Sequence, residues 1–192
     1  MTDEEINKLP GNYIAINAAT LRSGFTMASD PKTCSLLRTL AGTKPNGKIL
    51  ELGTGTGLST AWILDGMDHN AHLTSVDNDD TFLGIAKEYL NDSRLSLIQN
   101  DAGVWIEENK DKKFDLIFAD TWHGKYLMLN EVLNMLNPGG IYIIDDMLPQ
   151  TNWPEGHHEK ALNLLKTLDD RSDLNLTRQC WASGIVIACK KA

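Results

Sequence analysis

Three aspartates follow short apolar segments: Asp120 comes after residues 114–119, and Asp145 and Asp146 come after residues 140–144. If the two segments are neighbouring strands, about 4.8 Å apart, the three carboxylates converge at one edge of a sheet. Carboxylates placed together repel one another unless they are protonated or bridged by a cation. An all-oxygen cluster suits Mg²⁺ or Ca²⁺ better than zinc. The sequence therefore predicts a divalent-cation site here, and the alternative is that these residues only cap helices and shape turns.

His123 lies three residues after Asp120, within the stretch DTWHGKY. Histidine titrates near neutral pH and can remove a proton from a hydroxyl, particularly beside a metal ion that acidifies the hydroxyl. We therefore predict His123 and Asp120 as catalytic residues. Trp122 has two equally open interpretations, a gate over the substrate or a core aromatic residue.

A glycine-rich stretch, ELGTGTGLS, occupies residues 51–59. The alternating Gly53, Gly55 and Gly57 allow the backbone to turn tightly and to approach a ligand closely. The dinucleotide pattern G-x-G-x-x-G seats a pyrophosphate at a helix N-terminus, whereas this G-x-G-x-G spacing fits a ligand without phosphate. The glycines alone would also be compatible with a plain loop.

Two further acids strengthen the interpretation of the glycine stretch. Asp77 ends the apolar segment 72–77, where a carboxylate can accept hydrogen bonds from ribose hydroxyls, and Asp101 with Ala102 follows residues 95–100, where the pair would flank a base. The ordered acids at strand ends predict a nucleoside-binding face.

The elements that would position these residues alternate between strand and helix, which is typical of a mostly parallel sheet covered on both faces. Helices are predicted at 12–25 and after the Asp30 cap, with Pro31 at the first position and Gly42 at the end. The runs 174–181 and 184–191 are close enough for a hairpin only. We predict an α/β fold with a doubly wound, seven-stranded, mostly parallel sheet and a C-terminal antiparallel hairpin. Strands are predicted at 48–52, 72–77, 95–100, 114–120 and 140–145, and further helices at 80–92, 124–136 and 157–170.

Composition limits the classes of function. The chain has 192 residues, of which 42% are hydrophobic, and a formal net charge of −8. We predict one domain, residues 1–192, with N-terminal helices in 1–43 and a cofactor-binding sheet core in 47–192. The acidic charge disfavours binding to nucleic acid or anionic membranes. Three scattered cysteines, an acidic N-terminus and short apolar runs favour a reduced, cytoplasmic protein without a membrane span.

The successive stretches ILELGTGTGLSTAWIL, SVDND, NDA, FDLIFAD and LNPGGIYIIDD resemble the motifs of the class I S-adenosylmethionine-dependent methyltransferases. Within that superfamily the chain most resembles the catechol and caffeoyl-CoA type of small-molecule O-methyltransferases, which have a Rossmann-like fold. The resemblance covers about residues 27–147. It implies S-adenosyl-L-methionine as cofactor, a small-molecule hydroxyl as methyl acceptor, and a divalent cation. A homodimer is possible.

The resemblance also implies roles for individual residues. Glu51 and Ser59 would hold the amino or carboxylate end of the cofactor, Asp77 the ribose, and Asp101 with Ala102 the adenine. The predicted cofactor-binding set is Met27, Glu51, Gly53, Thr54, Gly55, Gly57, Ser59, Asp77, Asn78, Asp101, Ala102 and Asp120, and the predicted metal ligands are Asp120, Asp145 and Asp146.

Two residues depart from the family pattern: Asp146 replaces an asparagine, and His123 replaces the catalytic lysine. The alternatives are therefore a metal-independent methyltransferase of the same fold and a non-catalytic S-adenosylmethionine-binding protein. The stretch 147–160 is long for a connection and would lie over the substrate. His157 and His158 within it are expected to be solvated, although a ligand role for them would shift the metal preference.

Overall fold

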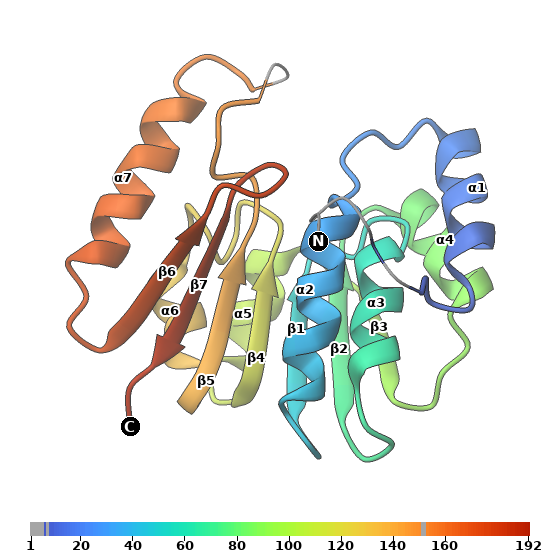
Figure 1. Ribbon diagram of the computed structural model, residues 1–192, viewed down its shortest axis with the longest axis horizontal. Coiled ribbons are helices and arrows are strands. Elements are labelled where there is room, and N and C mark those ends of the chain that lie inside the picture. The colour runs from blue at the N-terminus through green and yellow to red at the C-terminus, as the bar shows by residue number, and fades with distance from the viewer. Residues whose placement is uncertain (1–5, 7, 151–152) are drawn as a thin grey trace.

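Seven strands form one sheet in the order β3-β2-β1-β4-β5-β7-β6 (Figure 1). The computed structural model of the protein describes residues 6, 8–150 and 153–192. Strands β1 to β5 pair in parallel, and β7 runs antiparallel to both β5 and β6. The predicted sheet with its C-terminal antiparallel hairpin is therefore confirmed. The strands are β1 Lys48–Leu52, β2 His72–Asp77, β3 Leu95–Gln99, β4 Phe114–Ala119, β5 Leu136–Ile144, β6 Leu174–Gln179 and β7 Ile185–Lys190.

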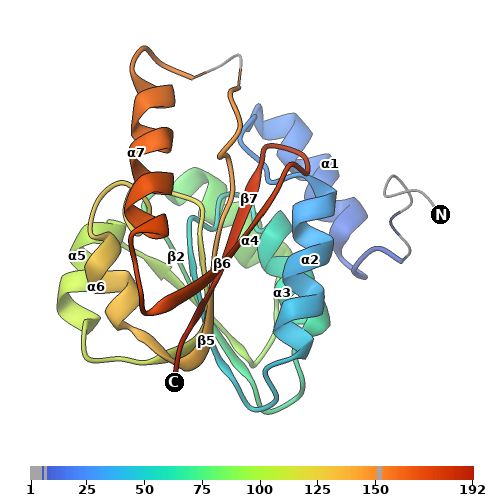
Figure 2. The same ribbon diagram turned by 60° about the vertical axis from the view of Figure 1, so that its left-hand side comes forward.

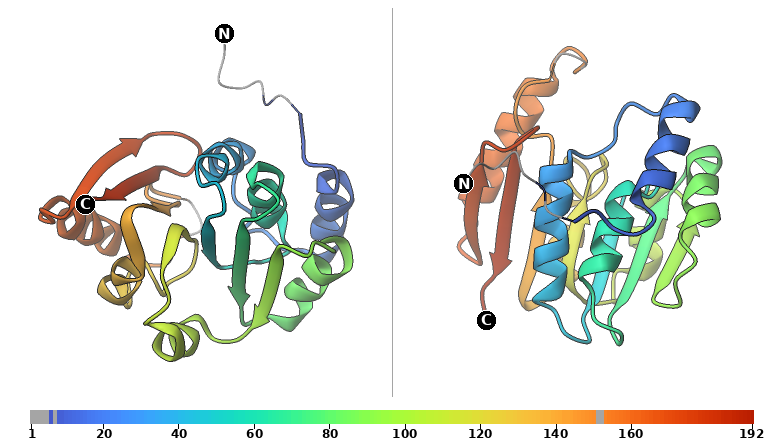
Figure 3. Two further views of the ribbon diagram at one scale, coloured as in Figure 1. Left: turned by 90° about the horizontal axis from the view of Figure 1, so that it is seen from below. Right: turned by 45° about the vertical axis from the view of Figure 1, so that its right-hand side comes forward.

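Helices cover both faces of the sheet, as the view along the strands shows (Figure 3). Buried side chains of α1 to α4 pack with one face, and those of α5 to α7 pack with the other. Because both faces are covered, the strands are apolar along most of their length. The helices are α1 Tyr13–Ser23, α2 Pro31–Gly42, α3 Leu58–Gly66, α4 Asp80–Tyr89, α5 Ala102–Asn109, α6 Leu129–Asn134 and α7 His157–Asp169.

A local signal explains where α2 begins. The Asp30 side chain accepts a hydrogen bond from the backbone of Lys32 at the start of α2, with Pro31 in the first turn, so this predicted cap is confirmed.

Helix α1 presents Ile14 and Leu21 outward, each 73% exposed. Among the described residues, no helix is long and apolar enough to cross a bilayer.

The helix predicted over 124–136 is wrong in its first part, because α6 begins only at Leu129. Gly124 and Met128 both have left-handed backbone conformations, with φ of 89° and 56°. A Cβ atom at Gly124 would lie 2.9 Å from the side chain of Leu52, so this residue fits closely against β1. Tyr142 also donates a hydrogen bond from its hydroxyl to the Gly124 carbonyl. Packing against the sheet therefore converts the first turn of the predicted helix into a tight loop.

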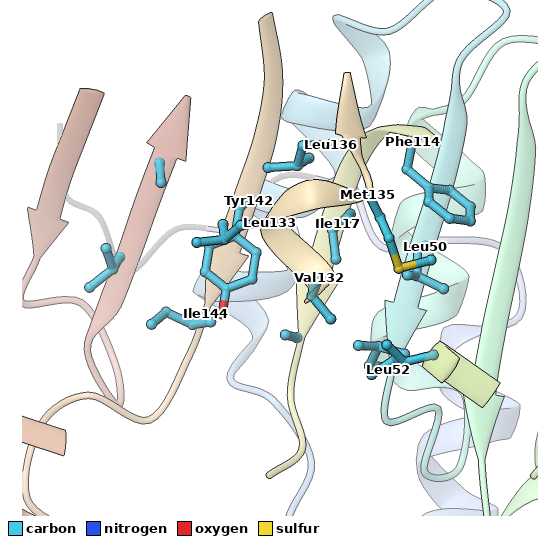
Figure 4. Packing of buried hydrophobic residues seen from close by; sticks show 14 of the residues in the cluster. Leu50, Leu52, Phe114, Ile117, Val132, Leu133, Met135, Leu136, Tyr142 and Ile144 are labelled. Atoms are coloured by element: carbon cyan, nitrogen blue, oxygen red, sulfur yellow. The ribbon is translucent and has the colours of Figure 1, made fainter. Parts of the chain in front are cut away.

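The core beneath α6 is formed by interlocking apolar side chains from β1, β4, β5 and α6 (Figure 4). Tyr142 lies at its centre with no exposed surface. This packing holds the carboxyl ends of β4 and β5 in a fixed relation to the loops above them.

Helices α2 and α3 lie side by side on one face of the sheet (Figure 2) and cross at two glycines. A Cβ atom at Gly66 would lie 2.0 Å from the carbonyl oxygen of Arg38, and one at Gly42 would lie 3.2 Å from the carbonyl of Gly66. The distance between the two helices therefore depends on the missing side chain at Gly66.

We expect Gly66→Ala to lower the free energy of unfolding by roughly 2 kcal/mol or more, because the new methyl group overlaps backbone atoms that cannot move independently. Urea denaturation would measure the change. The matched control is Gly84→Ala, because Gly84 is an exposed residue of α4 and no atom lies within 4 Å of its Cβ position. That control should raise stability by about 0.5–1 kcal/mol, and an equal loss in both variants would contradict the packing explanation.

Candidate functional site

A cavity of about 1170 Å³ opens at the carboxyl ends of β1, β2, β4 and β5. Most of the residues predicted from the sequence line it, although they come from six separate loops. Two do not, Glu51 and Gly57. The predicted residues in its wall are Met27, Gly53, Thr54, Gly55, Ser59, Asp77, Asn78, Asp101, Ala102, Asp120, His123, Asp145 and Asp146.

The glycine loop, residues 53–57, forms the floor of the cavity at the point where the sheet order reverses between β1 and β4. Gly53 has φ of 100°, and a Cβ atom there would lie 2.8 Å from the carbonyl oxygen of Asp120. Gly57 also has a positive φ, but its Cβ position faces Ala86 of α4 and Leu90 directly after that helix. Gly53 therefore lets the loop after β1 approach the backbone of Asp120, whereas Gly57 lets the start of α3 approach the end of α4.

Asp77 connects the glycine loop to the end of β2. Its carboxylate accepts hydrogen bonds from the backbone N–H of Gly55 at 2.7 Å and of Asp79 at 2.9 Å. Asp101 similarly accepts from the N–H of Val104 and caps α5. Both acids keep part of their surface in the cavity, so both remain candidates for contact with a nucleoside.

Glu51 lies behind the glycine loop and is completely buried. The hydroxyls of Ser59, Thr60 and Ser75 each donate to its carboxylate at 2.6 Å. Burial raises the pKa of Glu51 to about 7, although the three hydroxyls oppose the shift. In this arrangement Glu51 and Ser59 bind each other, and their predicted contact with a ligand stays a prediction.

The aspartates of β4 and β5 lie in the same wall of the cavity. Burial raises the pKa of Asp120 to about 6; Lys125 opposes the shift, and Asp145 and Asp146 add to it. Asp120 also accepts a hydrogen bond from the Ser29 hydroxyl at 2.9 Å. Burial likewise raises the pKa of Asp145. The three carboxylates predicted to converge at the ends of the two strands therefore line one cavity.

Two of the three predicted metal ligands, Asp120 and Asp145, already have other partners in this arrangement. Asp145 Oδ1 already accepts from the Ser183 hydroxyl and from the N–H of Asp146, 2.8 Å away. The Lys125 ammonium lies 4.0 Å from Asp120 Oδ1, where unit charges at an effective dielectric constant of about 20 interact by roughly 4 kcal/mol. A dication bound to Asp120 would have to share that carboxylate with the Lys125 ammonium. In the described part of the chain, no three His, Cys, Asp or Glu side chains are spaced for a metal ion.

His123 lies on the side of the cavity formed by α5. Its Nε2 atom is 2.7 Å from the position of a Cβ atom at Gly103, and Asp101 Oδ1 is 3.1 Å from the same position. The imidazole is thus packed against the start of α5, beside the acid predicted to flank the base. Its role as general base stays a prediction.

Aromatic side chains form another wall of the cavity. Trp122 is 43% exposed, so the interpretation as a core residue is wrong. The expectation that His157 is solvated is also wrong: it is 8% exposed and its Nε2 lies 3.1 Å from the Tyr126 hydroxyl. The rings of Trp122, Tyr126 and Trp153 all stand within 6 Å of the His157 ring. His158, in contrast, is exposed as expected.

Several residues of the cavity were not found from the sequence. Phe25 and Phe82 face each other with ring centroids 4.7 Å apart, and Phe25 also covers Gly55. Ser29 and Ser183 bind the aspartates from loops 91 and 38 residues away. No local spacing signals such contacts, because each depends on how loops pack above the sheet.

We expect stability to fall as the pH rises through the range between the ordinary pKa of a glutamate, 4.5, and the folded-state pKa of Glu51, about 7. The folded state binds the proton more tightly than the unfolded chain, so each step toward alkaline pH favours unfolding, by roughly 3 kcal/mol in total. Asp120 contributes in the same direction. Glu51→Gln should remove most of this loss, measured by urea denaturation at pH 5 and pH 8. Glu108→Gln, on exposed α5, is the matched control; the same pH dependence in both variants and the parent would contradict the assignment.

Comparison with known proteins agrees with this geometry. A family model described as a methyltransferase domain matches residues 50–147. A protein of Mycobacterium avium named "Putative O-methyltransferase" is 33% identical over 118 residues, which cover 57% of this chain and 51% of that protein. The chain spans about half the length of the curated relatives it matches.

Solved structures share the fold along nearly the whole chain. The O-methyltransferase from Bacillus cereus in complex with SAH has a TM-score of 0.86 at 15% identity, over 98% of this chain and 94% of that one. A protein from Staphylococcus aureus named "putative caffeoyl-CoA O-methyltransferase" has a TM-score of 0.78 at 18% identity, over 93% and 91%. The family model covers half of the chain and includes the glycine loop and all three aspartates. The protein therefore belongs to the methyltransferase domain family.

Proposed function

We propose that this protein transfers a methyl group from S-adenosyl-L-methionine to a hydroxyl group of a small molecule. The observation that carries the proposal is that one continuous cavity contains the glycine loop and also the acidic and aromatic residues above β4 and β5. A methyl donor and an acceptor must meet in one enclosed space, because transfer needs the acceptor oxygen in line with the methyl carbon.

The cofactor half of the cavity fits a nucleoside without phosphates. Gly53 has no side chain at the point where the glycine loop meets Asp120. Asp77 stands at the end of β2, which is where an acidic side chain binds ribose hydroxyls in doubly wound sheets. Asp101 and Ala102 stand at the start of α5, after the strand that pairs with β2, and would contact the base. The relatives of this chain are named O-methyltransferases, which favours a sulfonium methyl donor here.

The acceptor half lies between the aspartates and the aromatic wall. Trp122, Tyr126 and Trp153 supply apolar area, and the neutral form of His157 is favoured because burial, with Lys125 and Lys160, lowers its pKa. His123 would accept the proton of the acceptor hydroxyl. A methyl group on a sulfonium is already activated, so the chain needs to orient the acceptor and remove its proton.

The divalent cation predicted from the sequence is kept as a separate hypothesis, with Asp120, Asp145 and Asp146 as its ligands. The transfer described above does not depend on it, since Lys125 and Ser183 already contact two of these carboxylates, Asp120 and Asp145. The second candidate function is binding of S-adenosylmethionine without catalysis, favoured only by His123 at the position of the family's lysine. Transfer of a labelled methyl group to any member of a panel of phenols and catechols would exclude that candidate.

We expect Asp77→Ala to weaken the binding of S-adenosylhomocysteine by about 10- to 100-fold, the loss of one to two charge-assisted hydrogen bonds. Isothermal titration calorimetry would measure the affinity. Asp80→Asn, in the first turn of α4 and outside the cavity, is the matched control and should bind as the parent does. Unchanged affinity in Asp77→Ala would contradict the ribose assignment.

We expect His123→Ala to lower kcat by about 10²- to 10⁴-fold for a phenol that is protonated at the assay pH, because a general base is lost. The affinity for S-adenosylhomocysteine should not change, which separates a catalytic loss from a folding defect. The exposed His158→Ala serves as control and should retain full turnover. If His123→Ala also retains full turnover, His123 is not the general base, and another residue or water accepts the proton of the acceptor.

A further inference from the structure

Lys125 is a buried lysine in the wall of the proposed acceptor site. Its side chain is 5% exposed, which is rare for lysine unless the charge is paired. It lines the main cavity and also a second cavity of about 490 Å³ between α6 and α7, together with Trp122 and Tyr126. Lys125 therefore lies between the two cavities and lines both of them.

The contacts of this ammonium leave hydrogen-bonding capacity. Within residues 8–150 and 153–192, it makes an ion pair with Asp120 at 4.0 Å and a cation–π contact with Tyr126 at 5.8 Å, and no hydrogen bond. A lysine ammonium carries three N–H donors. An oxygen atom in the cavity could accept one of them while the ion pair with Asp120 remains.

The charge of Lys125 lies between the aspartates and the aromatic residues of the cavity. Its ammonium pairs with Asp120 Oδ1 and lies over the ring of Tyr126, whose hydroxyl is 3.1 Å from His157 Nε2. Lys166, by comparison, is exposed on α7 and lines neither of these two cavities.

We propose that Lys125 supplies, from within the chain, the positive charge beside the acceptor oxygen, so that the site takes an acceptor whose reacting oxygen is ionised and needs no divalent cation. The inference rests on the proposed methyl transfer. It assigns Lys125 as a substrate-binding residue and limits the acceptor class to acidic hydroxyls such as phenols and catechols with electron-withdrawing groups.

The methyl transfer to the ionised oxygen needs no metal ion. The acceptor O–H first gives its proton to His123 or to water, and the resulting oxyanion pairs with the Lys125 ammonium. The oxyanion then forms a bond to the methyl carbon of S-adenosylmethionine while the carbon–sulfur bond breaks, and the electron pair of that bond stays on sulfur. The products are a neutral methyl ether and S-adenosylhomocysteine, and Lys125 keeps its proton throughout.

The first test asks whether the site binds a divalent ion. The protein is stripped with EDTA, loaded with S-adenosylhomocysteine, and titrated with Mn²⁺, whose free form is followed by electron paramagnetic resonance. We expect no bound Mn²⁺ at up to about 1 mM, the weak limit of protein sites for divalent ions. Stoichiometric binding that is lost in Asp145→Ala would overturn the proposal.

The second test asks whether Lys125 holds an anion. The probe is 4-nitrocatechol, whose absorption band reports its ionisation, titrated into the S-adenosylhomocysteine complex at pH 8 with EDTA present. We expect the anion to bind, Lys125→Met to weaken it by about tenfold or more, as for one lost charge-assisted contact, and Lys125→Arg to retain most of the affinity. Lys166→Met, the control for general positive charge, should change the affinity by less than about threefold, since Lys166 is exposed on α7, lies outside both cavities and is screened.

Each other outcome has a meaning. Failure of the anion to bind the loaded parent, equal losses in Lys125→Met and Lys166→Met, or a requirement for Mg²⁺ would overturn the role of Lys125. Calorimetry with S-adenosylhomocysteine separates these results from a failure of the proposed function, because cofactor binding should be the same in all variants. If Lys125→Met does not fold, the Mn²⁺ titration and Lys125→Arg still decide the proposal.

Discussion

The whole site depends on one close approach, between the loop after β1 and the end of β4. Asp120 donates its backbone N–H to the Leu52 carbonyl at 2.8 Å, and Gly53 donates to the Val76 carbonyl at 2.9 Å. A side chain at Gly53 would collide with the Asp120 carbonyl. Because no Cβ atom stands there, β1, β2 and β4 end at one level, and the glycine loop and the aspartates share one cavity. Ligand sites in doubly wound sheets form at such a switch point.

The second constraint is the concentration of buried acid around this point. Glu51, Asp120 and Asp145 all have raised pKa values, chiefly because burial penalises the charged form. The protein compensates with hydroxyl donors, three on Glu51 and one on each of Asp120 and Asp145, and with the ammonium of Lys125 beside Asp120. Buried charges persist in folded proteins only with such partners. The position of Lys125 thus bears on stability and on the proposed chemistry together.

The acceptor side is built differently from the nucleoside side. The nucleoside side uses backbone turns and strand-end carboxylates, which follow directly from the sheet. The acceptor side uses Trp122, Tyr126, Trp153 and His157, which come from two loops and the start of α7 and contact one another ring to ring. Aromatic walls of this kind bury flat apolar area, while the Tyr126–His157 pair keeps a polar edge. A change of acceptor would therefore require changes in these loops, without any change in the glycine loop.

The sequence by itself determined the elements and their order. Strands β1 and β2 were predicted at their observed bounds, as was the start of α2, because apolar runs, caps and glycines act over a few neighbouring residues. The glycine loop and the strand-end acids followed from the same local signals. Only the tertiary structure decided that residues 124–128 form a loop, that His157 is buried, and that Lys125 pairs with Asp120. These outcomes depend on how side chains from different loops pack above the sheet, and no spacing within one segment records that packing.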